Sequence, residues 1–183
     1  MSEAHPDTTP LLESDIRAVL PHRYPFLLLD RVTDFVPGAR ITGLKHFSAG
    51  DEVAQGHFPD WPLVPTGILL ELVTQLGAVL VLERPEMKGK IAMILQIPSA
   101  RIIDPVLPGD TVRVEAEVLK LRETFGELRG AIYRGGALVA EGQMRFAIAD
   151  SASLSPSDRP DNTNSPGDSN KVGASTPPLR GIS

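Results

Sequence analysis

The segment TGILLELVTQLGAVLVLER, residues 66–84, lies between Pro65 and Pro85 and decides the fold. Proline is tolerated at a helix start because the first amides have no partner within the helix, and it stops a helix that reaches it. The spacing therefore predicts one long helix over 66–84. Its apolar residues leave almost no solvent-facing stripe, which predicts a helix that is buried on nearly all sides.

The sequence on either side of this helix predicts strands rather than further long helices. Residues 11–20 have apolar side chains at helical spacing and predict a short amphipathic helix that Pro21 stops. The Gly- and Pro-rich residues 50–65 predict a loop. We expect strands over 26–36, 40–47, 91–97, 99–103, 111–121, 127–133 and 138–148. One buried helix enclosed by an antiparallel sheet, an α+β fold, is the simplest packing of these pieces.

The chain of 183 residues, 42% hydrophobic and 22% charged, has room for one ordinary domain. We assign this domain to residues 11–149 and expect disorder in residues 1–10. The tail, residues 150–183, consists mostly of Ser, Pro, Gly, Asp, Asn and Thr. It cannot bury enough apolar surface to offset its ordering entropy, so we expect it to be disordered as well.

Composition excludes several classes of function. The absence of cysteine excludes disulfides, thiolate catalysis and Cys-based zinc sites. The net charge of -5, without a basic patch, argues against a nucleic-acid partner. The most apolar stretch, 68–82, is shorter than a bilayer requires and contains Glu71 and Gln75. We therefore expect a cytoplasmic protein with no membrane span. The four histidines lack carboxylates at ligand spacing, so we also expect no metal site.

Three polar residues interrupt the apolar helix: Glu71, Thr74 and Gln75. Spacings of three and four residues stack them on one face of the helix. An enclosed carboxylate is costly unless it is paired or hydrogen-bonded, and burial favours its protonated form, which can donate a proton. The helix by itself supports two readings of Glu71 equally. It is either part of a structural polar network or an acid in catalysis.

A histidine in the preceding loop favours the catalytic reading. His57 belongs to the sequence GHFP, residues 56–59, where Gly56 and Pro59 restrict the backbone on either side of it. Histidine titrates near neutral pH and can act as a base without much tuning. A lone loop histidine is usually only a solvated side chain. Together with Glu71, however, His57 predicts a base on a stiff loop and an acid on a rigid helix.

Five blocks of the sequence together resemble the FabZ-type (3R)-hydroxyacyl-[acyl-carrier-protein] dehydratases of the hotdog superfamily. They are LPHRYPFLLLDRV (20–32), GHFP (56–59), the set Pro62, Pro65, Glu71 and Gln75, then AR (100–101) and PVLPGD (105–110). The resemblance covers roughly residues 12–148. It implies a single hotdog fold, in which an antiparallel sheet wraps around a long central helix. It also implies a homodimer with two sites at its interface, a dimer that often assembles further into a trimer of dimers.

The resemblance also implies a reaction, catalysed by a lyase without metal or organic cofactor. A 3-hydroxyacyl thioester on an acyl carrier protein loses water and becomes the trans-2-enoyl thioester, in fatty-acid or related lipid or polyketide biosynthesis. His57 of one subunit would take the proton from C2, and Glu71 of the other would protonate the departing C3 hydroxyl. Gln75 would hydrogen-bond to Glu71 and orient it.

Further site residues follow from the position of the helix start. The unpaired amides of Thr66 or Gly67 are expected to stabilise the developing oxyanion, since helix N-termini carry free N–H groups and partial positive charge. An apolar channel for the acyl chain is expected to be lined by Phe58, Leu69, Leu70 and Ile97. Composition alone predicts that Leu69, Leu70 and Ile97 are ordinary core residues.

Three residues depart from the family's usual pattern. Asp60 and Thr66 stand where glycine is usual, and Asp104 stands where basic residues precede the Pro-Val block. These departures favour a specialised paralogue. The positive charges left to contact an acidic carrier are those of Arg23, Lys45, Lys88 and Arg101.

Two alternatives stay open, namely a thioesterase on the same fold and a non-catalytic acyl-binding homologue.

Overall fold

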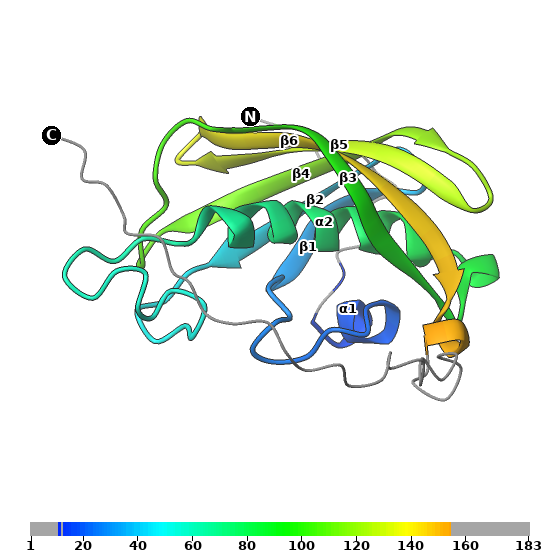
Figure 1. Ribbon diagram of the computed structural model, residues 1–183, viewed down its shortest axis with the longest axis horizontal. Helices are drawn as coiled ribbons and strands as arrows, with labels where there is room; N and C mark the ends of the chain where they lie inside the picture. The colour runs from blue at the N-terminus through cyan, green and yellow to red at the C-terminus, as the bar shows by residue number, and fades with distance from the viewer. Residues whose placement is uncertain (1–10, 12, 155–183) are drawn as a thin grey trace, which may run out of the picture.

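The computed structural model describes residue 11 and residues 13–154 (Figure 1). The predicted disordered segment 1–10 and most of the predicted tail lie outside the described residues. The described part starts with a short helix and a hairpin, continues through a long helix, and then forms four long strands followed by a short 3-10 helix. In order, the elements are α1 (Glu13–Val19), β1 (Arg31–Val36), β2 (Arg40–His46), α2 (Thr66–Leu82), η1 (Pro85–Met87), β3 (Lys90–Ile102), β4 (Thr111–Leu121), β5 (Phe125–Arg134), β6 (Ala137–Asp150) and η2 (Ser151–Leu154).

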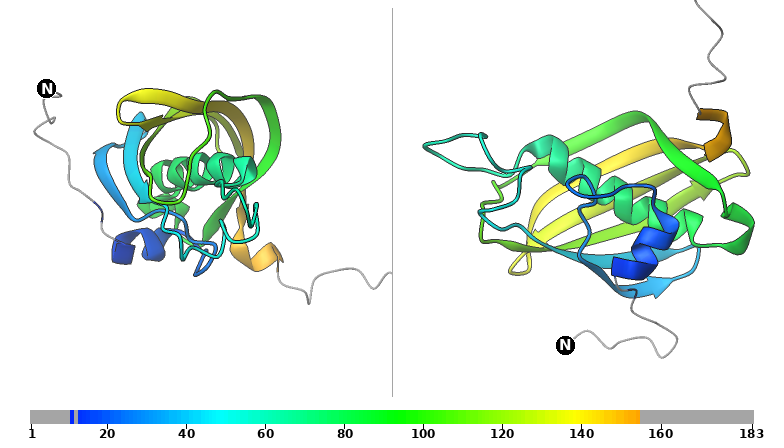
Figure 2. Two further views of the ribbon diagram at one scale, coloured as in Figure 1. Left: turned by 90° about the vertical axis from the view of Figure 1, so that its left-hand side faces the viewer. Right: turned by 90° about the horizontal axis from the view of Figure 1, so that it is seen from below.

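The strands form one antiparallel sheet in the order β1-β2-β4-β5-β6-β3. Figure 2 shows the sheet curving around α2, which runs along its inner face. Such curvature follows from the twist of the strands, because a flat sheet could not cover several sides of one helix. This is the predicted hotdog arrangement, and the α+β fold class is confirmed.

The long helix lies where the prolines predict it and is buried along most of its length. Pro65 precedes its first residue, and Val79, Leu80 and Val81 in its last turns are all buried. No helix in the described part of the chain is long and apolar enough to cross a membrane. The core is therefore built on one helix, whose side chains meet those of the sheet on several sides.

A glycine in the middle of the sheet allows α2 to approach closely. Gly130 of β5 lies where a Cβ atom would meet the Val73 side chain of α2 and would stand 2.7 Å from the Glu115 carbonyl oxygen. No side chain fits there without moving the backbone or the stiff, β-branched valine. The spacing between helix and sheet thus depends on the absence of a side chain at this position.

Three predicted strands differ from the observed ones. Residues 26–30 are not part of β1. Their backbone bonds to the Gln75 side chain and, at Asp30, to Leu44, and does not form a continuous ladder with a neighbouring strand. The predicted strands 91–97 and 99–103 are a single strand, β3, whose pairing with β6 shifts register around Pro98. Proline lacks an amide donor, and an edge strand tolerates it at such an irregularity.

The end of the domain also lies beyond the predicted boundary. Strand β6 continues to Asp150, and η2 extends the described structure to Leu154. The Ser151 amide donates to the Gly89 carbonyl at 2.9 Å, and the Ser153 hydroxyl donates to the Asp150 carbonyl at 2.6 Å. The first residues of the predicted tail, 150–154, therefore belong to the end of β6 and to η2, and the predicted disorder of the rest of the tail stays a prediction.

Candidate active site

The polar face of α2 is anchored by Gln75, which is fully buried. Its Nε2 donates to Glu71 Oε1 and to the Phe26 carbonyl, both at 2.8 Å, and its Oε1 accepts from the Leu28 amide at 3.0 Å. Both donor hydrogens and the carbonyl oxygen of the amide are therefore in use. One side chain fixes the orientation of the Glu71 carboxylate and ties the segment before β1 to the helix.

We expect Gln75→Leu to lower the free energy of unfolding by about 2 kcal/mol, because the Leu28 amide and the Phe26 carbonyl would lose their partners in a buried place. Urea denaturation monitored by circular dichroism measures this loss. Gln143→Leu is a matched control, since Gln143 is half-buried on β6 and bonds one carboxylate, that of Glu127. Equal, small losses in the two variants would contradict the anchoring role of Gln75.

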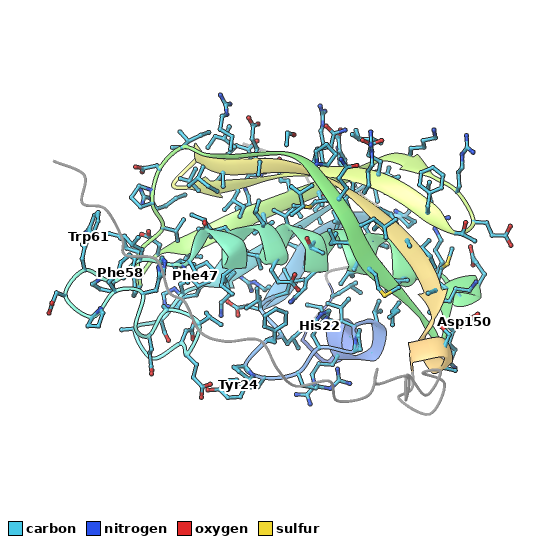
Figure 3. The ribbon with its side chains drawn as sticks, viewed as in Figure 1. His22, Tyr24, Phe47, Phe58, Trp61 and Asp150 are labelled. Atoms are coloured by element: carbon cyan, nitrogen blue, oxygen red, sulfur yellow. The ribbon has the colours of Figure 1, made fainter. Side chains whose placement is uncertain are left out.

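Glu71 has a second neighbour, the side chain of His22. The His22 Nε2 lies 3.7 Å from Glu71 Oε1, and its ring packs against Phe26 with centroids 5.8 Å apart. The Nδ1 atom of His22 is buried without a hydrogen-bond partner. Figure 3 shows His22 beneath α2, away from the loop that carries Phe58 and Trp61. The sequence placed His22 in a family block, but nothing local indicates contact with a residue so far along the chain.

His57 is half-buried in the loop before α2, and the backbone around it is well held. Its carbonyl accepts from the Leu63 amide at 2.8 Å, and Gly56 has a φ of +83°, which favours glycine. The His57 Nδ1 lies 3.4 Å from the Leu63 carbonyl oxygen. Because a carbonyl can only accept, this contact requires the tautomer with Nδ1 protonated. Nε2 is then free to take a proton.

The structure does not join His57 and Glu71 within one chain. Among the described residues, no hydrogen bond or ion pair connects the two side chains. Glu71 is on the second turn of α2, and His57 is in the loop that precedes the helix. The predicted site across a subunit boundary stays a prediction.

The start of α2 is open to solvent. Thr66 and Gly67 are both exposed, and no atom lies within 4 Å of the position that a Cβ of Gly67 would take. The amides of Ile68 and Leu69 donate to the Pro65 carbonyl at 2.9 and 3.3 Å. The first amides of the helix have no carbonyl partner within it, and the role of Thr66 and Gly67 in stabilising an oxyanion stays a prediction.

The four predicted channel residues lie on different elements. Leu69 is buried in the core of the single chain, and Leu70 is partly buried on the same helix. Phe58 is 52% exposed on the loop, and Ile97 is 43% exposed on the edge strand β3. Within one chain, Leu69 is thus a core residue, and only Phe58 and Ile97 present much surface.

The loop that carries His57 is pinned near its start by Lys45 and Asp51. The Lys45 side chain is only 12% exposed and its Nζ lies 3.2 Å from Asp51 Oδ2 and 3.5 Å from Asp30 Oδ1. Asp51 also accepts from the amide and the hydroxyl of Ser48, at 3.2 and 3.1 Å. Lys45 is therefore engaged within the chain, which makes it a poor candidate to contact a carrier protein.

This arrangement predicts a dependence of stability on pH. Partial burial alone would raise the pKa of the Asp51 carboxyl, but Lys45 and the Ser48 hydrogen bonds outweigh it and lower the pKa below its ordinary value. A depressed folded-state pKa stabilises the protein above the unfolded-state value, near 4, and this stabilisation is lost as the pH falls through the folded-state pKa.

Between about pH 5 and pH 3, we expect the melting temperature of Asp51→Asn to fall less than that of wild type. The variant has no carboxylate at position 51, so acid cannot remove a stabilising charge there. Thermal unfolding across this range measures the change. Asp60→Asn, at the exposed tip of the same loop, serves as the control. Identical pH profiles for wild type and Asp51→Asn would rule out the contribution of Asp51.

Comparison with known proteins supports a single assignment. The model of the FabA-like domain family matches residues 20–143. Two similar relatives are named 3-hydroxyacyl-[acyl-carrier-protein] dehydratase FabZ. The one from Pelotomaculum thermopropionicum is 45% identical over 135 residues, covering 74% of this chain and 96% of the relative. The one from Desulforamulus reducens is 44% identical over 133 residues, covering 73% and 94%.

Solved structures support the fold. The chain is similar to the dehydratase heterocomplex ApeI:P from Xenorhabdus doucetiae, with a TM-score of 0.65 and 19% identity over 76% of this chain and 93% of that one. A second similar structure is smu.793 from Streptococcus mutans, solved with acetyl CoA, with a TM-score of 0.54 and 17% identity over 72% and 96%. Because the matched relatives share both the length of the domain and over two fifths of its residues, the chain belongs to the FabA-like family, as a FabZ-type dehydratase.

Proposed function

We propose that this protein removes water from (3R)-3-hydroxyacyl thioesters on an acyl carrier protein and releases trans-2-enoyl thioesters for fatty-acid biosynthesis. One observation supports this proposal most strongly. The Glu71 carboxylate lies on α2, where the buried side-chain amide of Gln75 holds it in place. The loop that carries His57 leads directly into this helix. The relatives named as dehydratases support the same reaction. The cytoplasmic location predicted from the sequence stays a prediction.

The complete site is proposed to lie between two copies of the chain. Strand β3 is at the edge of the sheet, and its residues 94–102 are exposed. Leu95 is 65% exposed and lies near exposed Ile94 and Ile97. A long apolar edge with unpaired backbone groups favours pairing with another strand. A second copy of β3 would satisfy this edge and bring the helix of one subunit toward the loop of the other. Assembly of three such dimers stays a prediction.

The proposed chemistry uses one proton acceptor and one proton donor. His57 Nε2 takes the proton from C2, and the electrons of that C–H bond form an enolate that the amides of Thr66 or Gly67 stabilise. The enolate then collapses to the C2–C3 double bond, while the C3–O bond breaks and Glu71 protonates the leaving hydroxyl. Water and the enoyl thioester are the products, so the atoms and charges balance. Gln75 keeps the Glu71 carboxylate in place throughout.

The test is an assay of the full-length protein with crotonyl and 3-hydroxybutyryl thioesters, presented on acyl carrier protein and on coenzyme A. Enoyl absorbance and free thiol are followed in the same reaction. Interconversion of the two thioesters without thiol release supports the dehydratase. Thiol release would show a thioesterase, and tight binding without turnover would show an acyl-binding protein. Poor turnover of short carrier-bound substrates is expected if Thr66, Asp60 and Asp104 mark a specialised paralogue.

A further inference from the structure

The connection between β3 and β4, residues 103–110, is held by a group that the proposed chemistry does not use. We call it the Arg134 clamp, and it consists of Arg134, Asp104 and Asp110. Arg134, at the end of β5, donates from Nη1 to the Pro105 carbonyl at 2.7 Å and to Asp110 Oδ2 at 3.0 Å. Its Nη2 donates to Asp104 Oδ2. One planar guanidinium thus holds two carboxylates and one carbonyl of the same connection.

The clamped connection is in turn bonded to the segment just before α2. Asp110 Oδ2 accepts not only from Arg134 but also from the Leu107 amide, at 2.9 Å. Val106, between the two ends of the clamp, is buried, and its carbonyl accepts from the Val64 amide at 2.9 Å. Val64 is therefore bonded to a connection that Arg134 holds together with backbone hydrogen bonds to Phe47 and Val139.

Val64 is next to the residue that touches the imidazole of His57. The Leu63 amide donates to the His57 carbonyl at 2.8 Å, and the Leu63 carbonyl lies 3.4 Å from His57 Nδ1. The carbonyl of Leu63 and the amide of Val64 belong to the same planar peptide unit. A shift of the clamped connection would therefore rotate or displace the group that selects the tautomer of His57.

We propose that Arg134 is a positioning residue for the base of the reaction. Through the clamp and the Val106–Val64 hydrogen bond, it holds the Leu63 carbonyl where His57 keeps Nδ1 protonated and Nε2 free. This inference rests on the proposed function. It also accounts for Asp104, one of the three departures from the family pattern, because this carboxylate is part of the clamp. Asp104 acts within the chain rather than toward a carrier protein.

The test compares Arg134→Met with Arg129→Met as a matched control. Arg129 lies on the same strand and forms an ion pair with Glu117, and its contacts do not involve residues 103–110. Nitrogen-15 NMR reads the tautomer of His57, whose signals are assigned by their loss in His57→Ala, and steady-state assays give kcat and KM. In Arg134→Met we expect a second tautomer of His57 and a fall in kcat of about tenfold to a hundredfold with KM little changed.

The remaining outcomes separate the inference from the function on which it rests. Arg134→Lys should restore part of kcat and of the original tautomer, and Arg129→Met should match wild type. An unchanged His57 tautomer and an unchanged kcat in folded Arg134→Met would overturn the inference. If wild type shows no dehydration, the proposed function fails, and the tautomer alone decides the inference. If Arg134→Met does not fold, Asp104→Asn, which keeps the Asp110 half of the clamp, is judged by the same measurements.

Discussion

Replacing His57 by alanine or Glu71 by glutamine should lower kcat for dehydration by about a thousandfold or more, because each change removes one of the two groups that move a proton. Both variants should fold. Glutamine at position 71 keeps an oxygen that can accept from Gln75, and His57 is half-buried in a loop that backbone hydrogen bonds and the Lys45–Asp51 ion pair also hold. Circular dichroism and thermal unfolding verify that the fold is kept.

Two control variants make the same substitutions, His to Ala and Glu to Gln, at positions outside the proposed site. His46→Ala removes an exposed histidine that contacts Thr111, and Glu83→Gln changes an exposed carboxylate directly after α2. Both should keep activity close to that of wild type. The double variant of His57 and Glu71 should be hardly worse than either single variant, since the two groups act as a unit. Substantial activity in either single variant would refute the assignment of roles.

Mixing the two inactive variants tests whether the site crosses a subunit boundary. In a mixed dimer of His57→Ala and Glu71→Gln, one interface site carries both changes and the other carries none. Random pairing should then restore about a quarter of the wild-type activity, given a two-fold symmetric dimer. Co-expression with two affinity tags, or joint unfolding and refolding, produces the mixed dimers. No restored activity in mixed dimers would place both residues of each site in one chain and disprove the shared site.

Replacing Gly130 by alanine should lower the free energy of unfolding by about 3 kcal/mol, because overpacking a filled core forces side chains and backbone apart. The new methyl group would meet the Val73 side chain, which is β-branched and has little rotamer freedom, and the Glu115 carbonyl, which is part of the sheet. Neither neighbour can move without disturbing α2 or β4. For a domain of this size, such a loss lowers the melting temperature by about 10 °C.

The control for this prediction is the glycine directly opposite on the next strand. Gly142 of β6 pairs with Gly130, and a Cβ there would be 3.4 Å from its nearest neighbours, which include the Leu70 side chain. Gly142→Ala should therefore cost at most about 1 kcal/mol. Urea denaturation of both variants measures the difference. If the two variants were equally stable, the close approach of α2 to β5 would not be a requirement of the fold.

Several features of the site follow from local sequence alone. Prolines at both ends and an almost continuous apolar run determine where α2 begins and why it is buried. The interruption of that run by Glu71 and Gln75, one helical turn apart, indicates that their side chains can meet. The structure contains this hydrogen bond, at 2.8 Å. Gly56 beside His57 likewise indicates a turn in the loop.

Other features depend on contacts between distant segments. His22 meets Glu71, Gln75 binds the backbone around Phe26, and the Arg134 clamp reaches the loop of His57 through residues 103–110. The first five residues of the predicted strand 26–36 are not in β1 for this reason, since their backbone bonds to a side chain of α2. No pattern with a period of two or 3.6 residues describes such pairs.

Sequence by itself determined the buried helix, the alternating strands and the residue types that carry the proposed chemistry. These features depend on the volume and polarity of nearby side chains and on the local freedom of the backbone, all of which are properties of residues close together in the sequence. Tertiary structure alone decided that His22 approaches Glu71, that Gln75 binds the backbone around Phe26, and that Gly130 must lack a side chain. The residues in each of these contacts are far apart in the sequence, and only the packed fold brings them together. Hydrogen bonds and steric repulsion act only over a few ångströms, so they depend on that packing.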